Sequence, residues 1–168
     1  MELRKTTEKD ISSVMEIIRA AQRYFRKANI YQWVNNYPNE EIIMEDIRKG
    51  YSYVLLQNEK VVATAAVAFD GEPTYEKIYQ GQWLTHEKYA VIHRIAVAED
   101  LKGQGVALEV MKKVEGLCQE RQVKSIKIDT HEDNKSMQRF LEKSGFIYCG
   151  IIYLESGSKR IAFEKILK

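Results

Sequence analysis

A strand that passes through a glycine turn into a helix is the feature that most constrains this chain. It lies at residues 94–108, where the apolar run Ile95-Ala96-Val97 precedes Gly103-Gln104-Gly105 and an amphipathic segment. The first N–H groups of a helix have no intrahelical partner, and the helix dipole places partial positive charge there. Glycines let the backbone approach a phosphate closely. The stretch therefore predicts an anion site of the kind that holds a pyrophosphate.

Composition limits what this site can belong to. The chain has 168 residues, 45% of them hydrophobic, which predicts a single globular domain over residues 1–168. A net charge of +2 without a basic stripe argues against a nucleic-acid partner, and no apolar run is long enough to cross a membrane. We expect no partner of either kind.

The cysteines and histidines indicate no metal site. Cys118 and Cys149 lie far apart, and the three histidines do not follow a metal-ligand pattern. Free thiols in a chain without a recognisable signal peptide favour a reducing compartment, so we expect a cytoplasmic protein that binds no metal.

Hydrophobic periodicity predicts alternating helices and strands. A short strand comes first, then a helix that begins at Thr7 with Asp10 completing a capping box, and a second helix that begins at Pro38. The later strands are expected at residues 52–57, 61–69, 89–97, 125–130, 146–154 and 160–166, with helices after Gly105 and after Asp133 or Asn134. The insertion at 70–88 is either functional, or a surface loop or one extra turn of helix.

The glycine turn alone does not identify a cofactor. A dinucleotide-binding fold requires Gly-x-Gly-x-x-Gly after the first strand, and a P-loop requires Gly-Lys-Ser/Thr. Here the glycines come late, a third glycine is absent, and Lys102 precedes Gly103. Both classes of nucleotide site are therefore disfavoured.

Two motifs together resemble the GCN5-related N-acetyltransferases (GNAT family). Lys102-Gly103-Gln104-Gly105-Val106-Ala107 resembles the family's acyl-CoA loop, Arg/Gln-x-x-Gly-x-Gly/Ala. The segment from Asn134 to Phe146 resembles its second signature, an Asn-started helix that ends in Lys-x-Gly-Phe. The order of expected elements also fits, so the resemblance covers nearly the whole chain.

The resemblance implies a fold and a cofactor site. The fold is α/β (α+β), with a mixed, mostly antiparallel, twisted sheet that splays between its fourth and fifth strands and about four flanking helices. Acetyl-CoA is the implied cosubstrate. The residues implied to bind it are Ile95, Ala96 and Val97 beside the pantetheine arm, Lys102, Gly103, Gln104, Gly105, Val106, Ala107 and Leu108 around the pyrophosphate, and Asn134. An Asn134 that only caps its helix is the alternative.

Two positions depart from the family pattern. Lys102 stands where Arg or Gln is usual, and it can face phosphate only as a point charge. Leu141 stands where many members carry the tyrosine that protonates the leaving thiolate. Tyr148 or Tyr153 is a possible replacement, or the thiolate departs with help from water and backbone dipoles.

The chemistry needs a base and an oxyanion contact. An attacking amine must lose a proton, and histidine titrates close to neutral pH. In a regular strand, His93 shares a face with Val97, so we expect His93 to be the base. The resemblance suggests the backbone N–H of Val97 for the oxyanion. The alternative for His93 is a hydrogen-bonded position within the sheet.

Several aromatic and acidic residues are candidates for an acceptor pocket, because aromatic side chains often wall small-ligand sites. They are Tyr31, Trp33, Glu72, Tyr75 and Trp83, with Tyr79 as a further option. Glu72 and Glu76 of the insertion are also weaker alternatives to His93 for the base. Core packing is the alternative for each aromatic ring.

The sequence therefore predicts an acetyl-CoA-dependent N-acetyltransferase that acts on a primary amine by direct attack on the thioester. A non-catalytic acyl-CoA-binding module is the alternative, because Leu141 replaces the tyrosine. The acceptor is unidentified (a small amine, an amino acid, an antibiotic or a protein), and the oligomeric state stays open, although homodimers are common in such families.

Overall fold

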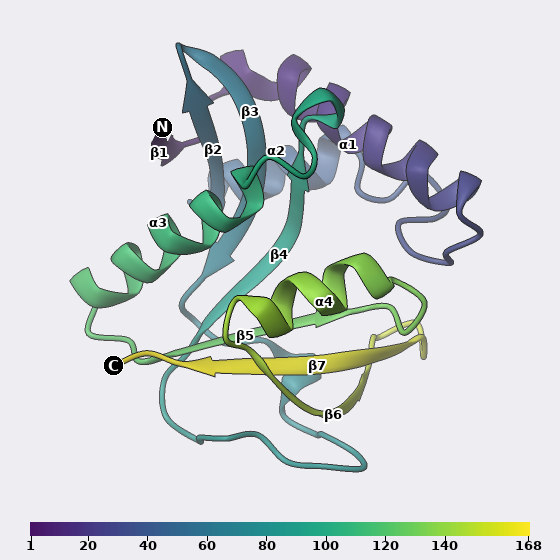
Figure 1. Cartoon of the computed structure of the whole chain (residues 1–168), viewed down its shortest axis with the longest axis vertical. Coiled ribbons are helices and arrows are strands. Elements are labelled where there is room, and N and C mark those ends of the chain that lie inside the picture. Colours follow the sequence, from purple (N-terminus) through teal and green to yellow (C-terminus); the bar gives the residue numbers. More distant parts are fainter. The chain divides into compact units, whose positions relative to one another are not determined.

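The computed structural model describes residues 1–168 and contains one mixed sheet and four α-helices (Figure 1). The strands are β1 (Glu2–Lys5), β2 (Ser52–Gln57), β3 (Lys60–Ala68), β4 (Ala90–Val97), β5 (Ser125–Thr130), β6 (Ile147–Tyr153) and β7 (Lys159–Ile166). The helices are α1 (Ile11–Lys27), α2 (Glu40–Arg48), α3 (Val106–Glu120) and α4 (Lys135–Lys143). The 7-stranded sheet has the order β1-β2-β3-β4-β5-β7-β6. The expected α/β fold class is confirmed.

The chain divides into two compact units, and β4 and α3 each contribute residues to both. The first unit comprises Met1–Val67 and His93–Val114, and the second comprises Ala68–Ile92 and Glu115–Lys168. The glycine turn and the C-terminal part of β4 therefore belong to the first unit, and Asn134 belongs to the second.

Antiparallel pairing builds the sheet of the first unit. β1 pairs with β2, and β2 pairs with β3. The turn between β2 and β3 contains Asn58, with φ of 49°, and Glu59, with φ of 64°. Two left-handed residues match the twist of a tight hairpin, so the turn forms here without glycine. The apolar faces of α1 and α2 pack on this sheet, with Val14, Ile18, Ile43 and Val54 in the core.

A capped turn leads into α1. The carboxylate of Asp10 accepts a hydrogen bond from the backbone N–H of Thr7 at 2.8 Å, as the capping box predicts. The same carboxylate accepts two hydrogen bonds from the Arg4 guanidinium, at 2.7 and 3.0 Å. The hydrogen bonds from Arg4 hold the pKa of Asp10 down, at about 2. This pair ties β1 to the start of α1.

The segment between α1 and α2 is a loop, and the start of α2 differs from the sequence prediction. Pro38 does not open the second helix, because α2 begins at Glu40 with Asn39 as its N-cap. The Asn39 side chain accepts a hydrogen bond from the N–H of Ile42 at 3.0 Å, which is the usual role of a capping asparagine. The buried Gln22 side chain of α1 donates to the carbonyls of Tyr37 and Pro38 and so fixes the loop against the helix.

The sheet of the second unit begins where β4 and β5 run parallel. Their partners are Ala90 with Ile126 and Val91 with Lys127. β5 then pairs with β7, and β7 with β6, in antiparallel register. Parallel pairing of β4 with β5 among antiparallel pairs gives the mixed sheet that the sequence predicts.

The insertion at 70–88 packs on the second unit. Tyr79 forms a bridge with Ile151 of β6, with two hydrogen bonds of 2.8 Å. Gly81 permits this approach, because a Cβ there would lie 1.9 Å from the carbonyl oxygen of Cys149. The backbone N–H of Leu84 donates to the buried Glu164 carboxylate at 2.6 Å. The insertion is therefore an ordered part of this unit.

Buried polar groups in the second unit have partners. Glu164 also accepts a hydrogen bond from the hydroxyl of Ser125 at 2.6 Å. The ammonium of buried Lys127 lies 4.4 Å from the ring centre of Trp83 and 4.1 Å from that of Tyr89. Burial lowers the pKa of Lys127. Cation–π contacts compensate part of the cost of burying this charge.

Neither cysteine is exposed. Cys118 is buried in α3, and Cys149 lies in the core of the second unit. Burial raises the pKa of both thiols, to about 12 for Cys118 and about 11 for Cys149. None of the helices combines the length and the apolar character that crossing a bilayer requires.

Candidate functional site

The glycine turn has the conformation that an anion cradle requires. Gly103 has φ of 77° and Gly105 has φ of 82°, in the left-handed region that glycine adopts without strain. A Cβ built on either residue would meet no atom within 4 Å. The turn is exposed from Lys102 to Gly105. Open space therefore lies beside the backbone on this side of the loop.

The start of α3 supplies donors next to that space. The N–H of Glu109 donates to the carbonyl of Gly105 at 3.1 Å, and this is the first bond of the helical pattern. The N–H groups of Val106, Ala107 and Leu108 precede it and lack intrahelical acceptors. The side chain of Val106 is buried, which anchors the helix start while its backbone stays at the turn.

Lys102 adds positive charge beside the glycine turn, where its ammonium contacts an aromatic ring. Its ammonium lies over the ring of Tyr24 of α1, 4.3 Å from the centroid. This cation–π contact holds the charge beside the loop in an exposed position. Binding of a phosphate by Lys102 would require the ammonium to leave that ring.

The backbone of β4 has one edge on β3 and one edge turned away from it. The N–H of Ala98, just after the strand, donates to the carbonyl of Val62 at 2.9 Å. Successive residues of a strand direct their N–H and C=O groups to opposite edges. The backbone groups of Val97 and Ile95 therefore face away from β3, and this alternation favours them over Ala96 for hydrogen bonds with an extended ligand.

A left-handed residue interrupts β4 at Arg94. Its φ is 52°, which is uncommon for a residue with a side chain and costs about 1–3 kcal/mol. The predicted alternation of faces from His93 to Val97 assumes an unbroken strand, and Arg94 breaks it. The shared face of His93 and Val97 is thus not a consequence of strand geometry, and their relation depends on the kink between them.

Arg94 is held by an ion pair that the sequence did not reveal. Its Nε and Nη2 atoms donate to the two carboxylate oxygens of Asp46 in α2, each at 2.7 Å. Its Nη1 atom donates to the hydroxyl of Tyr37 at 2.9 Å. The side chains of Arg94 and Asp46 are 16% and 6% exposed. Burial disfavours the charge on Arg94, but the hydrogen bonds from it to Asp46 and Tyr37 outweigh burial and raise its pKa.

His93 is half-buried and directly precedes this kink. Its separation from Val97 along the chain corresponds, in a straight strand, to about 13 Å between their Cα atoms. The left-handed residue Arg94 interrupts the straight path between them.

Asn134 lies in the second unit as the N-cap of α4. Its side chain accepts a hydrogen bond from the N–H of Met137 at 3.2 Å, and the residue is buried. The side-chain amide of Gln138 donates to the carbonyls of His131 and Glu132 and fixes the turn before the cap. The capping role predicted as the alternative is present, and it occupies one lone pair of the amide oxygen.

The acceptor candidates of the first unit lie on the loop between α1 and α2. Tyr31 is 62% exposed, the most exposed of the large hydrophobic side chains. Trp33 packs instead against the core of α1, α2 and β2, and its ring meets that of Phe25 edge-on, with centroids 5.6 Å apart. Of the two, only Tyr31 offers most of its ring to a ligand.

The candidates of the second unit have internal partners. Tyr75 is 2% exposed and donates its hydroxyl to Asp129 at 2.6 Å. Trp83 is 7% exposed and donates its indole N–H to the carbonyl of Tyr75 at 2.8 Å. Glu72 accepts hydrogen bonds from the backbone and hydroxyl of Thr74. These contacts favour the packing interpretation of the two rings.

The positions considered for the general acid differ in what they can donate. Leu141 is fully buried and carries no proton donor. Tyr148 and Tyr153 of β6 are about half exposed, and their rings pack against Phe163 and Tyr79 respectively. Both hydroxyl-bearing rings belong to the second unit.

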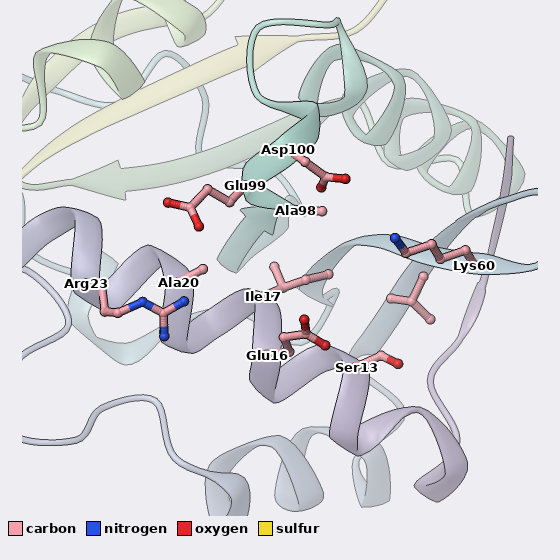
Figure 2. A pocket seen from close by; sticks show the side chains of 10 residues that line it. Ser13, Glu16, Ile17, Ala20, Arg23, Lys60, Ala98, Glu99 and Asp100 are labelled. Atoms are coloured by element: carbon pink, nitrogen blue, oxygen red, sulfur yellow. The ribbon is translucent and has the colours of Figure 1, made fainter.

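A separate pocket of about 390 Å³ lies in the first unit (Figure 2). It is bounded by α1, by the start of β3 and by the segment Ala98–Asp100, and it contains none of the predicted site residues. The carboxylates of Glu16, Glu99 and Asp100 outnumber the cationic side chains of Arg23 and Lys60 there. This charge balance disfavours a phosphate, and none of the glycine-turn residues Lys102–Leu108 lines the pocket.

Arg94 and Asp46 are the site-forming residues that sequence reasoning missed. A signal for Arg94 was present, because a charged residue inside an apolar strand needs a partner if the strand is buried. The partner could not be chosen, since α2 alone carries Glu40, Glu41, Glu45 and Asp46. No group of three or more His, Cys, Asp or Glu side chains is placed to hold a metal ion.

Comparison with known proteins identifies the family of the chain. The model of the "Acetyltransferase (GNAT) family" matches residues 14–146, a range that includes parts of both units. A curated relative, the "Uncharacterized N-acetyltransferase YesJ" of Bacillus subtilis (strain 168), is 22% identical over 143 residues, which cover 84% of this chain and 78% of that protein.

Solved structures share the fold over the full length. An acetyltransferase of the GNAT family from Streptococcus agalactiae 2603 is 33% identical, with a TM-score of 0.89 and coverage of 99% of this chain and 95% of that one. The PaiA N-acetyltransferase of Thermoplasma acidophilum, solved in complex with coenzyme A, has a TM-score of 0.72 over 98% of each chain. At 12% identity, the latter similarity shows the fold alone.

The two signature motifs, the confirmed fold class and a family match over residues 14–146 lead to one conclusion. The chain belongs to the GNAT family of acetyltransferases and is an N-acetyltransferase.

Proposed function

We propose that the protein transfers the acetyl group of acetyl-CoA to a primary amine by direct attack of the amine on the thioester. The proposal rests on three features that follow one another along the chain in the first unit. They are the edge of β4 that faces away from β3, a left-handed glycine turn and a helix start with unpaired N–H groups. An extended backbone edge suits the amide-bearing pantetheine arm, and a helix start suits the pyrophosphate.

The cofactor contacts are assigned from that arrangement. The backbone groups of Ile95 and Val97 bind the pantetheine arm, with Ala96 between them. The N–H groups from Lys102 to Leu108 bind the pyrophosphate in the open space beside Gly103 and Gly105. Asn134, which the family resemblance places among the cofactor contacts, accepts a hydrogen bond from the N–H of Met137 as the N-cap of α4.

The reaction forms a C–N bond and breaks the C–S bond of the thioester. The amine loses a proton to His93 through water, and the N–H of Val97 stabilises the oxyanion that develops on the carbonyl oxygen. The departing thiolate must take up a proton. Because Leu141 offers none, solvent supplies it, or Tyr148 or Tyr153 does.

For the acceptor side we favour the loop between α1 and α2. Tyr31 has an exposed ring on this loop, and Tyr37 joins the loop to Arg94. The acceptor class is a primary amine. The further acceptor candidates, whose polar or aromatic groups already have internal contacts, are Trp33, Glu72, Tyr75 and Trp83.

The proposal predicts thiol release from acetyl-CoA in the presence of a suitable amine. A panel of small amines, amino acids, amine antibiotics and peptide N-termini is assayed for free thiol, with binding of CoA measured in parallel by calorimetry. We expect CoA to bind and at least one amine to raise thiol release well above hydrolysis. Binding without any amine-dependent release would favour a non-catalytic acyl-CoA module, and absence of binding would refute both functions.

The glycine turn can be tested by Gly105→Ala. Left-handed angles cost a residue with a Cβ about 1–2 kcal/mol, and the methyl group would enter the space assigned to the pyrophosphate. We expect the Kd for acetyl-CoA to rise by about tenfold or more, because the methyl group competes with the pyrophosphate for this space and each 1.4 kcal/mol lost in binding is tenfold in affinity. Gly157→Ala is the matched control, since Gly157 has φ of 86° with equally open surroundings in the turn between β6 and β7. Equal effects of both variants on affinity would contradict the assignment.

The base assignment can be tested by His93→Ala. General base catalysis contributes about 10²–10⁴-fold, so we expect kcat to fall by about 100-fold, with a smaller change in the KM for acetyl-CoA. His86→Ala, at an exposed position of the insertion, serves as control. A loss of less than about threefold would remove His93 from the mechanism.

A further inference from the structure

The kink of β4 at Arg94 lies between His93 and Val97. The proposed function assigns the base to His93 and the oxyanion contact to Val97. Arg94 follows His93 and precedes Ile95–Val97, so its backbone angles set how the base and the oxyanion donor lie relative to each other. Its φ of 52° is strained for a residue with a Cβ. Strained angles persist only where surrounding contacts impose them.

The side chain of Arg94 makes the contacts that hold this conformation. The guanidinium makes a bidentate pair with Asp46 and a third hydrogen bond with Tyr37, so all three of its nitrogen atoms are used. Asp46 lies within α2, which packs against β2 through the core of the first unit. The fork geometry of arginine and carboxylate fixes direction as well as distance.

We propose that Arg94 and Asp46 are positioning residues, whose ion pair holds the left-handed turn of β4 and thereby sets the catalytic relation of His93 and Val97. The inference rests on the proposed function for its catalytic consequence. Its structural part, that the pair fixes the path of the chain from Ile95 to Ala98, stands without the proposed function. Neither residue needs to touch substrate to act in this way.

The first unit contains a matched pair that serves as control. Arg4 and Asp10 also form a bidentate pair, at 2.7 and 3.0 Å, between a strand and the start of a helix. Asp10 and Asp46 are both largely buried. The Arg4 pair lies away from β4, and the side chain of Arg4 is 36% exposed. Breaking it tests the general effect of losing a partly buried ion pair.

The experiment compares Arg94→Ala, Arg94→Gly, Asp46→Asn and Arg4→Ala by steady-state kinetics and by hydrogen–deuterium exchange. We expect Arg94→Ala to lower kcat by about 10- to 100-fold, since misplacement by about 1 Å costs that much. Arg94→Gly should recover part of kcat, because glycine adopts the left-handed angle without strain. Arg4→Ala should reduce thermal stability with kcat unchanged.

Exchange gives a readout that does not depend on activity. Breaking the Arg94–Asp46 pair should speed exchange in the peptide that covers residues 95–98, and Arg4→Ala should not. A folded Arg94→Ala or Asp46→Asn variant with wild-type kcat and exchange would overturn the inference, as would equal losses from Arg94→Ala and Arg4→Ala. If wild-type protein shows no acetyl transfer, the proposed function fails, while the exchange comparison still decides whether the pair fixes β4.

Discussion

The arrangement of the first unit depends on the ion pair between Arg94 and Asp46. Breaking a buried pair by removing one partner typically costs about 3–5 kcal/mol, because the remaining charge is left without compensation. Arg94 also carries the left-handed angle that interrupts β4. One side chain thus stabilises an unfavourable backbone conformation, links the strand to α2, and reaches the loop between α1 and α2 through Tyr37.

The donor side of the proposed reaction needs little from individual side chains. Backbone groups of Ile95 and Val97, two left-handed glycines and the unpaired N–H groups at the start of α3 provide its polar contacts. Such contacts are set by strand and helix geometry rather than by side-chain identity. This explains why Lys102 can replace arginine and lie over Tyr24 without removing the cradle. It also explains why the position of the backbone, which Arg94 controls, matters so much for the proposed chemistry.

Local patterns in the sequence were enough to predict the elements and the family. Hydrophobic periodicity located the helices and strands, and the glycine turn with the Asn134 segment identified the family and the fold class. The features that sequence reasoning missed depend on contacts between distant residues. Local alternation could not reveal the kink at Arg94, whose partner Asp46 lies far away in the chain. Nor could it show that Lys127 lies over the rings of Trp83 and Tyr89, which makes packing the simpler interpretation of these aromatic residues.

A crystal structure of the protein with coenzyme A tests the central claim most directly. The account predicts pantetheine hydrogen bonds to the backbone of Ile95 and Val97, pyrophosphate oxygens at the N–H groups around Gly103–Leu108, and an intact Arg94–Asp46 pair with Arg94 in the left-handed conformation. Coenzyme A bound away from this edge of β4, or a regular extended Arg94 separated from Asp46 in the complex, would contradict it.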